Sequence, residues 1–98
     1  MLSHYVTAKY GLLGFVKSLA SELTAYNCTF NMVSPGMVKT DLLSNVPHKL
    51  IEMTASASPM KRIADPSDVA KVIYFLASDN SDYLNGVNIP INGGNIFL

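Results

Sequence analysis

Apolar residues recur at steps of three and four from Ser3 to about residue 25, which is the spacing of one face of an amphipathic helix. Gly11 and Gly14 lie inside this pattern, where each costs a helix about 1 kcal/mol relative to alanine. We therefore predict a helix over residues 3–25 whose glycines allow close approach of another helix or backbone segment. Its apolar face comprises Leu12, Phe15, Val16, Leu19, Ala20 and Leu23.

A run of β-branched and apolar residues follows and closes at Ser34-Pro35-Gly36. It predicts a buried strand over about residues 28–34, with Cys28 among its small buried side chains. From residue 37 to 60 no period persists, and polar residues alternate with short apolar clusters. This indicates a long, partly helical loop of the kind that often carries binding residues.

Three signals of a helix start coincide at residues 65–68. Asp65 is an N-cap acceptor, Pro66 suits the first helical position, and Asp68 places a carboxylate in the first turn. We predict a helix over 66–78 and, after a polar turn, a short strand over 87–91. The order helix, strand, loop, helix, strand is typical of an α/β protein with a parallel sheet. Two parallel strands do not form an independent sheet, so the chain is expected to be the last third of a larger domain.

Charge and composition exclude several functions. The 98 residues carry seven basic and seven acidic side chains, so no basic surface is expected for nucleic acid or anionic membranes. The longest apolar run covers only residues 72–77, whereas a membrane span needs roughly 20 residues, and no leader is recognisable. The single cysteine has no partner for a disulfide or a zinc site. We expect a cytoplasmic protein without metal.

Tyr5 and Lys9 form the first candidate for chemistry. Four residues apart on a helix, their side chains share one face and their tips can meet. A nearby ammonium favours the phenolate and lowers the pKa of a phenol, so the pair could shuttle a proton to a carbonyl oxygen. His4 points about 100° away around the helix and is not expected to take part. Such a pair also arises by chance, so alone it is weak evidence.

Four blocks in order strengthen this interpretation. They cover residues 5–11, 31–40, 65–70 with 75–79, and Gly86 with Asn92-Gly93-Gly94. Together they resemble the C-terminal part of the short-chain dehydrogenase/reductase family, and the resemblance extends over nearly all of the chain. The Gly-Gly ending is most similar to the single-domain branch that includes the 3-oxoacyl-thioester reductases.

The resemblance implies a doubly wound parallel, Rossmann-like sheet, incomplete in this chain, and NAD(H) or NADP(H) as the cofactor of the complete enzyme. It implies that Tyr5 protonates a small-molecule carbonyl substrate during hydride transfer, and that Lys9 activates Tyr5 and binds the nicotinamide ribose. Residues 37–60 would form a substrate lid, and a homo-oligomer is expected. The turn after the first strand would bind the cofactor through Pro35, Gly36, Val38 and Thr40. Lid residues that either line the substrate pocket or simply pack are Met37, Leu42, Leu43 and Met53.

Other features of the family are not found in these 98 residues. The Gly-rich turn that places the cofactor pyrophosphate at a helix N-terminus is absent, as are the catalytic Ser and an upstream Asn of the proton relay. We therefore expect this segment to bind no dinucleotide tightly and to be inactive alone. Two alternatives stay open: the chain is a non-catalytic oligomerisation or interaction fragment of the same origin, or Met1 is only an apparent start.

Overall fold

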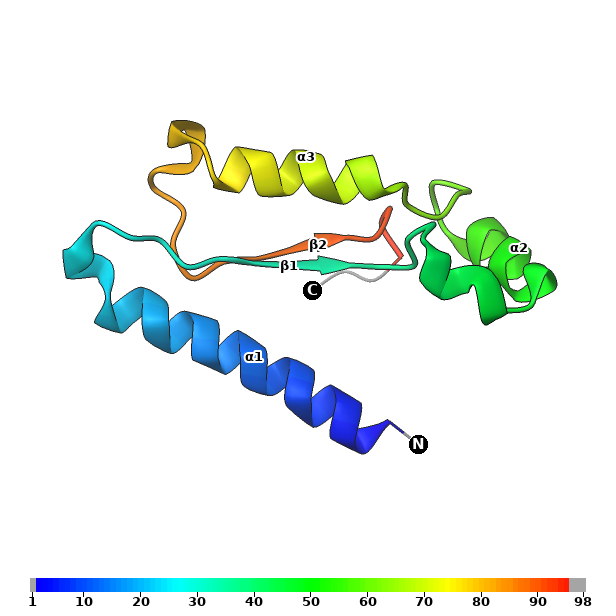
Figure 1. Ribbon diagram of the computed structural model, residues 1–98, viewed down its shortest axis with the longest axis horizontal. Coiled ribbons are helices and arrows are strands. Elements are labelled where there is room, and N and C mark those ends of the chain that lie inside the picture. The colour runs from blue at the N-terminus through cyan, green and yellow to red at the C-terminus, as the bar shows by residue number, and fades with distance from the viewer. Residues whose placement is uncertain (1, 96–98) are drawn as a thin grey trace. The chain divides into compact units, whose positions relative to one another are not determined.

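The structure is a computed structural model that describes residues 2–95. The elements follow the predicted order helix, strand, loop, helix, strand, and the predicted loop contains one further helix (Figure 1). In chain order the elements are α1 (Ser3–Glu22), the 3-10 helix η1 (Thr24–Tyr26), β1 (Met32–Pro35), the 3-10 helix η2 (Asp41–Asn45), α2 (His48–Ala57), α3 (Pro66–Leu76), the 3-10 helix η3 (Asp79–Ser81) and β2 (Asn88–Ile91).

Strands β1 and β2 lie side by side and form a two-stranded sheet (Figure 1). Backbone hydrogen bonds join Gly86 N to Phe30 O (2.7 Å), Met32 N to Val87 O (2.8 Å) and Gly36 N to Ile91 O (3.0 Å). Along β1 the residue numbers of the bonded partners increase in the same direction as those on β2, which identifies a parallel ladder. The predicted parallel sheet is confirmed, and within the described residues it has two strands.

Contacts divide the chain into two compact units. The first comprises Met1–Met32 and Phe75–Asn88, and the second comprises Val33–Tyr74 and Ile89–Leu98. Tyr5 and Lys9 therefore belong to the first unit, whereas the turn after β1 belongs to the second.

Helix α1 ends at Glu22, three residues before the predicted end. The hydroxyl of Thr24 donates back to the carbonyl of Ala20, and the N–H of Leu23 donates to Leu19 O (2.9 Å). The chain then tightens into η1 and turns at Asn27, whose φ of 58° is left-handed. Asparagine tolerates this conformation better than most residues. Helix α3 likewise ends two residues early, at Leu76 rather than residue 78.

Strand β1 begins at Met32, four residues after the predicted start. The N–H of Phe30 is taken by the side chain of Asn85 (3.0 Å), so regular strand pairing starts only beyond it. Cys28 lies between the turn at Asn27 and β1 and is exposed, and its thiol donates to Tyr26 O (3.5 Å). The prediction that Cys28 is a buried strand residue is wrong, because the left-handed turn at Asn27 precedes the strand.

The first unit contains little apolar core. Among the described residues, Ala20 is the only buried apolar one, at 5% exposure. Gly86 has a φ of +77°, a left-handed conformation that favours glycine. A Cβ there would also lie 3.3 Å from the Ala20 methyl, which is a tight contact. The apolar face of α1 is unevenly covered: Leu12 and Phe15 are 47% and 59% exposed, whereas the later residues of the face, Val16, Leu19 and Leu23, are half-buried.

Gly11 and Gly14 have no close neighbour within the described residues. A Cβ built on either would meet no atom within 4 Å, so the predicted close approach is not found here. Replacing each by alanine should therefore raise the free energy of unfolding by about 1 kcal/mol through helix propensity alone. Urea unfolding followed by circular dichroism measures this effect. If the glycines serve contact between chains, the same replacements will instead weaken association, which sedimentation detects.

Candidate functional site

Tyr5 and Lys9 meet on α1 as their spacing predicts. The Lys9 Nζ lies over the Tyr5 ring, 5.4 Å from its centroid, which is within the range of a cation–π contact. Tyr5 is 53% exposed and Lys9 is also exposed, so a substrate oxygen can reach the phenol. The arrangement provides a proton donor with a cation beside it.

Pro35 is the last residue of β1, and Gly36 follows it directly. The N–H of Gly36 donates to Ile91 O (3.0 Å) and continues the pairing with β2. A Cβ at Gly36 would stand 3.5 Å from Cα and Cβ of Asn92, an ordinary contact, and its φ is not left-handed. Space within this chain therefore does not by itself require glycine. Both residues are exposed and accessible to a ligand.

Val38 is held by an isolated parallel bridge to Ala64. The N–H of Lys39 donates to Ala64 O (2.8 Å), and the N–H of Ala64 donates to Met37 O (3.0 Å). Successive peptide groups of an extended chain point in opposite directions, so the N–H and C=O of Val38 are directed away from Ala64. This orientation leaves the backbone of Val38 facing outward from the bridge, where it can bind a ligand.

Thr40 precedes the 3-10 helix η2. Its carbonyl accepts from Leu43 N (3.0 Å), while its side chain makes no cap hydrogen bond. The residue is exposed. Its hydroxyl is therefore accessible at the surface, close in sequence to the outward backbone of Val38.

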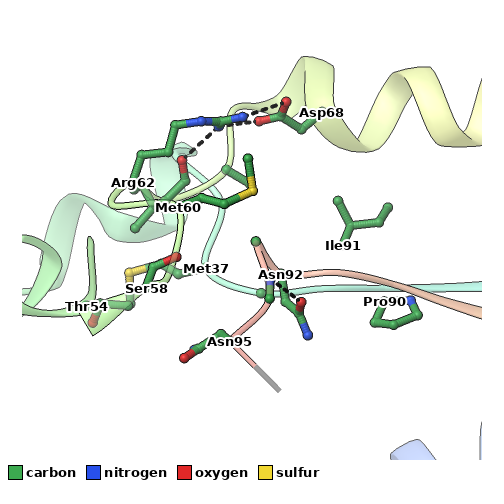
Figure 2. Close-up of a pocket in the computed structure, with 15 residues that line it drawn as sticks. Met37, Thr54, Ser58, Met60, Arg62, Asp68, Pro90, Ile91, Asn92 and Asn95 are labelled. Atoms are coloured by element: carbon green, nitrogen blue, oxygen red, sulfur yellow. Dashed lines mark hydrogen bonds and ion pairs between the residues drawn. The ribbon is translucent and has the colours of Figure 1, made fainter. Parts of the chain in front are cut away.

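A cavity of about 350 Å³ lies in the second unit (Figure 2). Met37, one of the four lid residues considered above, lines it, whereas Leu42 and Met53 are 87% and 59% exposed. The cavity was not predictable from sequence, because its walls come from four separate stretches of chain. Its lining comprises Gly36, Met37, Thr54, Ser58, Met60, Arg62, Ile63, Ala64, Asp68, Pro90, Ile91, Asn92, Gly93, Gly94 and Asn95.

Arg62 and Asp68 both line this cavity and form a bidentate ion pair with each other (Figure 2). The two nitrogen–oxygen distances are 2.7 and 3.2 Å, and the Asp68 carboxylate also accepts from the N–H of Asp65 (2.8 Å). Asp65 and Asp68 thus form one half of a capping box at the start of α3, as expected for helix capping. The hydrogen bonds from Arg62 and then from Asp65 lower the pKa of Asp68 to about 2.

This lowered pKa gives a prediction for acid stability. The folded pKa of Asp68 is about 2, below the ordinary value of about 3.9, so the ion pair contributes its full stability above about pH 4. The contribution is lost as pH falls through about 2. In Arg62→Gln the pKa of Asp68 should rise but stay below its ordinary value, because the Asp65 N–H remains. Carboxylate ¹³C NMR titration of both proteins measures it, and an unchanged midpoint would contradict the assignment.

Over residues 2–95, histidine, cysteine and carboxylate side chains nowhere gather in a group that could hold a metal ion. None of the described helices is long and apolar enough to cross a membrane.

Comparison with known proteins identifies the family. The family described as Enoyl-(Acyl carrier protein) reductase matches residues 1–95. The chain belongs to the short-chain dehydrogenase/reductase family. Its match to a solved short-chain dehydrogenase/reductase of Brucella melitensis has a TM-score of 0.91 at 32% identity, and covers 99% of this chain and 39% of that one. The Rossmann-like fold class is thereby confirmed, as a partial fold.

Curated relatives place the chain near the predicted branch. It is 40% identical over 92 residues to the 3-oxoacyl-(acyl-carrier-protein) reductase of Buchnera aphidicola, covering 94% of this chain and 38% of the relative. It is also 40% identical over 92 residues to the reductase of the same name from Thermotoga maritima, covering 94% and 37%. The chain thus spans somewhat over a third of the length of these relatives. The resemblance to 3-oxoacyl reductases is confirmed.

Proposed function

We propose that this chain is the C-terminal segment of a single-domain NAD(P)-dependent oxidoreductase that interconverts a carbonyl and an alcohol by hydride transfer. The observation that carries the proposal is the contact between Lys9 and Tyr5 on α1, in a chain of this family. The relatives named as 3-oxoacyl-(acyl-carrier-protein) reductases support a carbonyl carried on a thioester as the substrate. The cofactor supplies or accepts the hydride.

Tyr5 is proposed to donate its phenolic proton to the substrate carbonyl oxygen as that oxygen gains negative charge. Lys9 is the activator: its ammonium beside the ring stabilises the phenolate left after proton transfer. In the reverse reaction the same phenolate accepts the proton of the alcohol. Neither step requires a metal.

The cofactor-binding residues fit their proposed roles. The backbone N–H and C=O of Val38 are directed away from Ala64 and can bind an amide such as the nicotinamide carboxamide. Thr40 offers an accessible hydroxyl, and the turn at Pro35 and Gly36 presents exposed backbone. Lys9 would also bind the nicotinamide ribose. The Gly-rich phosphate turn lies outside this sequence, so tight binding is expected only of the complete domain.

The test is to complete the domain. The chain is joined to the N-terminal part of the Thermotoga maritima relative, and NADPH binding and reduction of a 3-oxoacyl thioester are measured on this chimera and on the chain alone. We expect binding and turnover by the chimera, and neither by the chain alone. A chimera that binds NADPH but does not reduce the thioester would overturn the proposal.

A second candidate function is a non-catalytic interaction segment. The observation that favours it is the exposed apolar surface of α1, where Tyr5, Tyr10, Leu12 and Phe15 are all about half exposed or more. Such a surface stabilises contacts with another chain, and the family resemblance implies a homo-oligomer. Sedimentation of the chain alone tests this candidate. The candidate requires that the chain self-associates and that the chimera shows no turnover. We also propose that the complete oxidoreductase is cytoplasmic.

A further inference from the structure

We propose that Asn92 and Gly93 form a modification site, at which the asparagine amide converts to aspartate or isoaspartate through a cyclic succinimide. The reaction consumes only water. The proposal goes beyond the oxidoreductase function and does not depend on it. The chain contains an Asn-Gly dipeptide twice, at residues 85–86 and 92–93, and the hydrogen bonds around the two copies differ in a way that favours reaction at the second.

The reaction joins two neighbouring groups of one chain. The backbone nitrogen of Gly93 loses its proton and bonds to Cγ of Asn92, and the side-chain nitrogen leaves with a proton as ammonia. Water then opens the succinimide ring at one of its two carbonyls, which gives aspartate or isoaspartate, and nothing is oxidised or reduced. Glycine favours the first step because it has no Cβ to crowd the attacking nitrogen.

The geometry at Asn92 favours this attack. The N–H of Gly94 donates to Asn92 Oδ1 (3.0 Å), which folds the side-chain carbonyl back over the peptide that follows it (Figure 2). The same bond stabilises the negative charge that develops on Oδ1 as Cγ becomes tetrahedral. Among the described residues the N–H of Gly93 has no hydrogen-bond acceptor. Its nitrogen can therefore react without a hydrogen bond being broken first.

The other copy, Asn85 with Gly86, is held in an unreactive arrangement. The N–H of Gly86 is bound to Phe30 O (2.7 Å), so its nitrogen can attack only after that bond breaks. The Asn85 side chain is fixed as well: its Oδ1 accepts from Phe30 N (3.0 Å), and its Nδ2 donates to Ala20 O (3.1 Å) and Thr24 Oγ1 (3.0 Å). At both copies an N–H donates to the side-chain oxygen, so the attacking nitrogen and the fixed amide make the difference.

The product would change a closely packed part of the second unit. A Cβ on Gly93 would stand 3.2 Å from Ser58 Oγ and 3.4 Å from Met60 Cβ, so little free space surrounds this residue. Isoaspartate inserts one methylene group into the backbone directly before Gly93 and adds a carboxylate. The backbone at Gly93 would therefore have to move against Ser58 and Met60.

Peptide mass spectrometry of the chimera tests the site, with Asn85 as the internal control. The protein is kept at neutral pH and digested at intervals in acid, which stops the reaction, and deamidation of both asparagines is measured in the same samples. In the folded domain we expect Asn92 to react at least tenfold faster than Asn85, because the bonds around Asn85 and Gly86 must open first. In denaturing urea these bonds are lost, and the two rates should converge.

Two variants of Thr24 isolate the protection of Asn85. Thr24→Val removes one acceptor of Asn85 Nδ2 and should raise the Asn85 rate about two- to tenfold, the value of one hydrogen bond. Thr24→Ser keeps the hydroxyl and should react as the unmodified domain does, and the Asn92 rate should be the same in all three proteins. The proposal is overturned if Asn92 reacts no faster than Asn85 in the folded domain, if the difference persists in urea, or if Thr24→Val leaves the Asn85 rate unchanged.

Discussion

Replacing Tyr5 by phenylalanine is expected to lower the kcat for thioester reduction in the completed domain by about 100- to 10,000-fold, the usual contribution of general acid catalysis. The change removes only the hydroxyl. The ring that Lys9 contacts remains, and Tyr5 is 53% exposed, so the fold should be unaffected. Steady-state kinetics with saturating NADPH measures the effect.

Tyr10→Phe is the matched control for this prediction. Tyr10 lies on the same helix and is 67% exposed, but it has no role in the proposed chemistry. The control should keep full activity, and both variants should bind NADPH as the unmodified chimera does. A loss of less than tenfold in Tyr5→Phe, or an equal loss in Tyr10→Phe, would show that Tyr5 is not the proton donor.

The elements that local signals specify were predictable from the sequence. Pro66 and the carboxylate of Asp68 predicted the start of α3, and the structure places the start at Pro66. The spacing of Tyr5 and Lys9 predicted their contact, since a helix brings residues four apart together. These features depend on a few neighbouring residues, so local sequence signals were enough to predict them.

Features that depend on distant partners were not predictable. The ion pair of Arg62 with Asp68 requires the turn between them to fold back, and the burial of Ser58 requires the loop at Gly93 to lie against it. Pro59 does indicate the end of a helix, but nothing in its neighbourhood indicates that Ser58 is buried. The late start of β1 has the same origin, because the partner of Phe30 is Asn85, 55 residues later.

Asn31 makes two hydrogen bonds to residues more than 50 positions later, and these should contribute to stability. Its Nδ2 donates to Leu84 O (3.1 Å), and its Oδ1 accepts from Val87 N (3.1 Å), so one side chain binds the backbone on both sides of the turn that leads to β2. Both bonds are partly buried, and replacement by leucine would leave both backbone groups without this partner. We expect Asn31→Leu to lower the free energy of unfolding by about 2 kcal/mol.

Urea unfolding of the completed domain measures this loss, and amide hydrogen exchange localises it. Exchange should accelerate more at Val87, whose N–H loses its acceptor, than at Met32, whose bond to Val87 O remains. Asn31→Asp keeps an acceptor for Val87 N but removes the donor to Leu84 O. Its free energy of unfolding should therefore lie between those of the unmodified protein and Asn31→Leu. Asn80→Leu, at an exposed position of η3, should change stability by no more than about 0.5 kcal/mol. Equal losses in Asn31→Leu and Asn80→Leu would mean that the two side-chain bonds do not hold β2 beside β1.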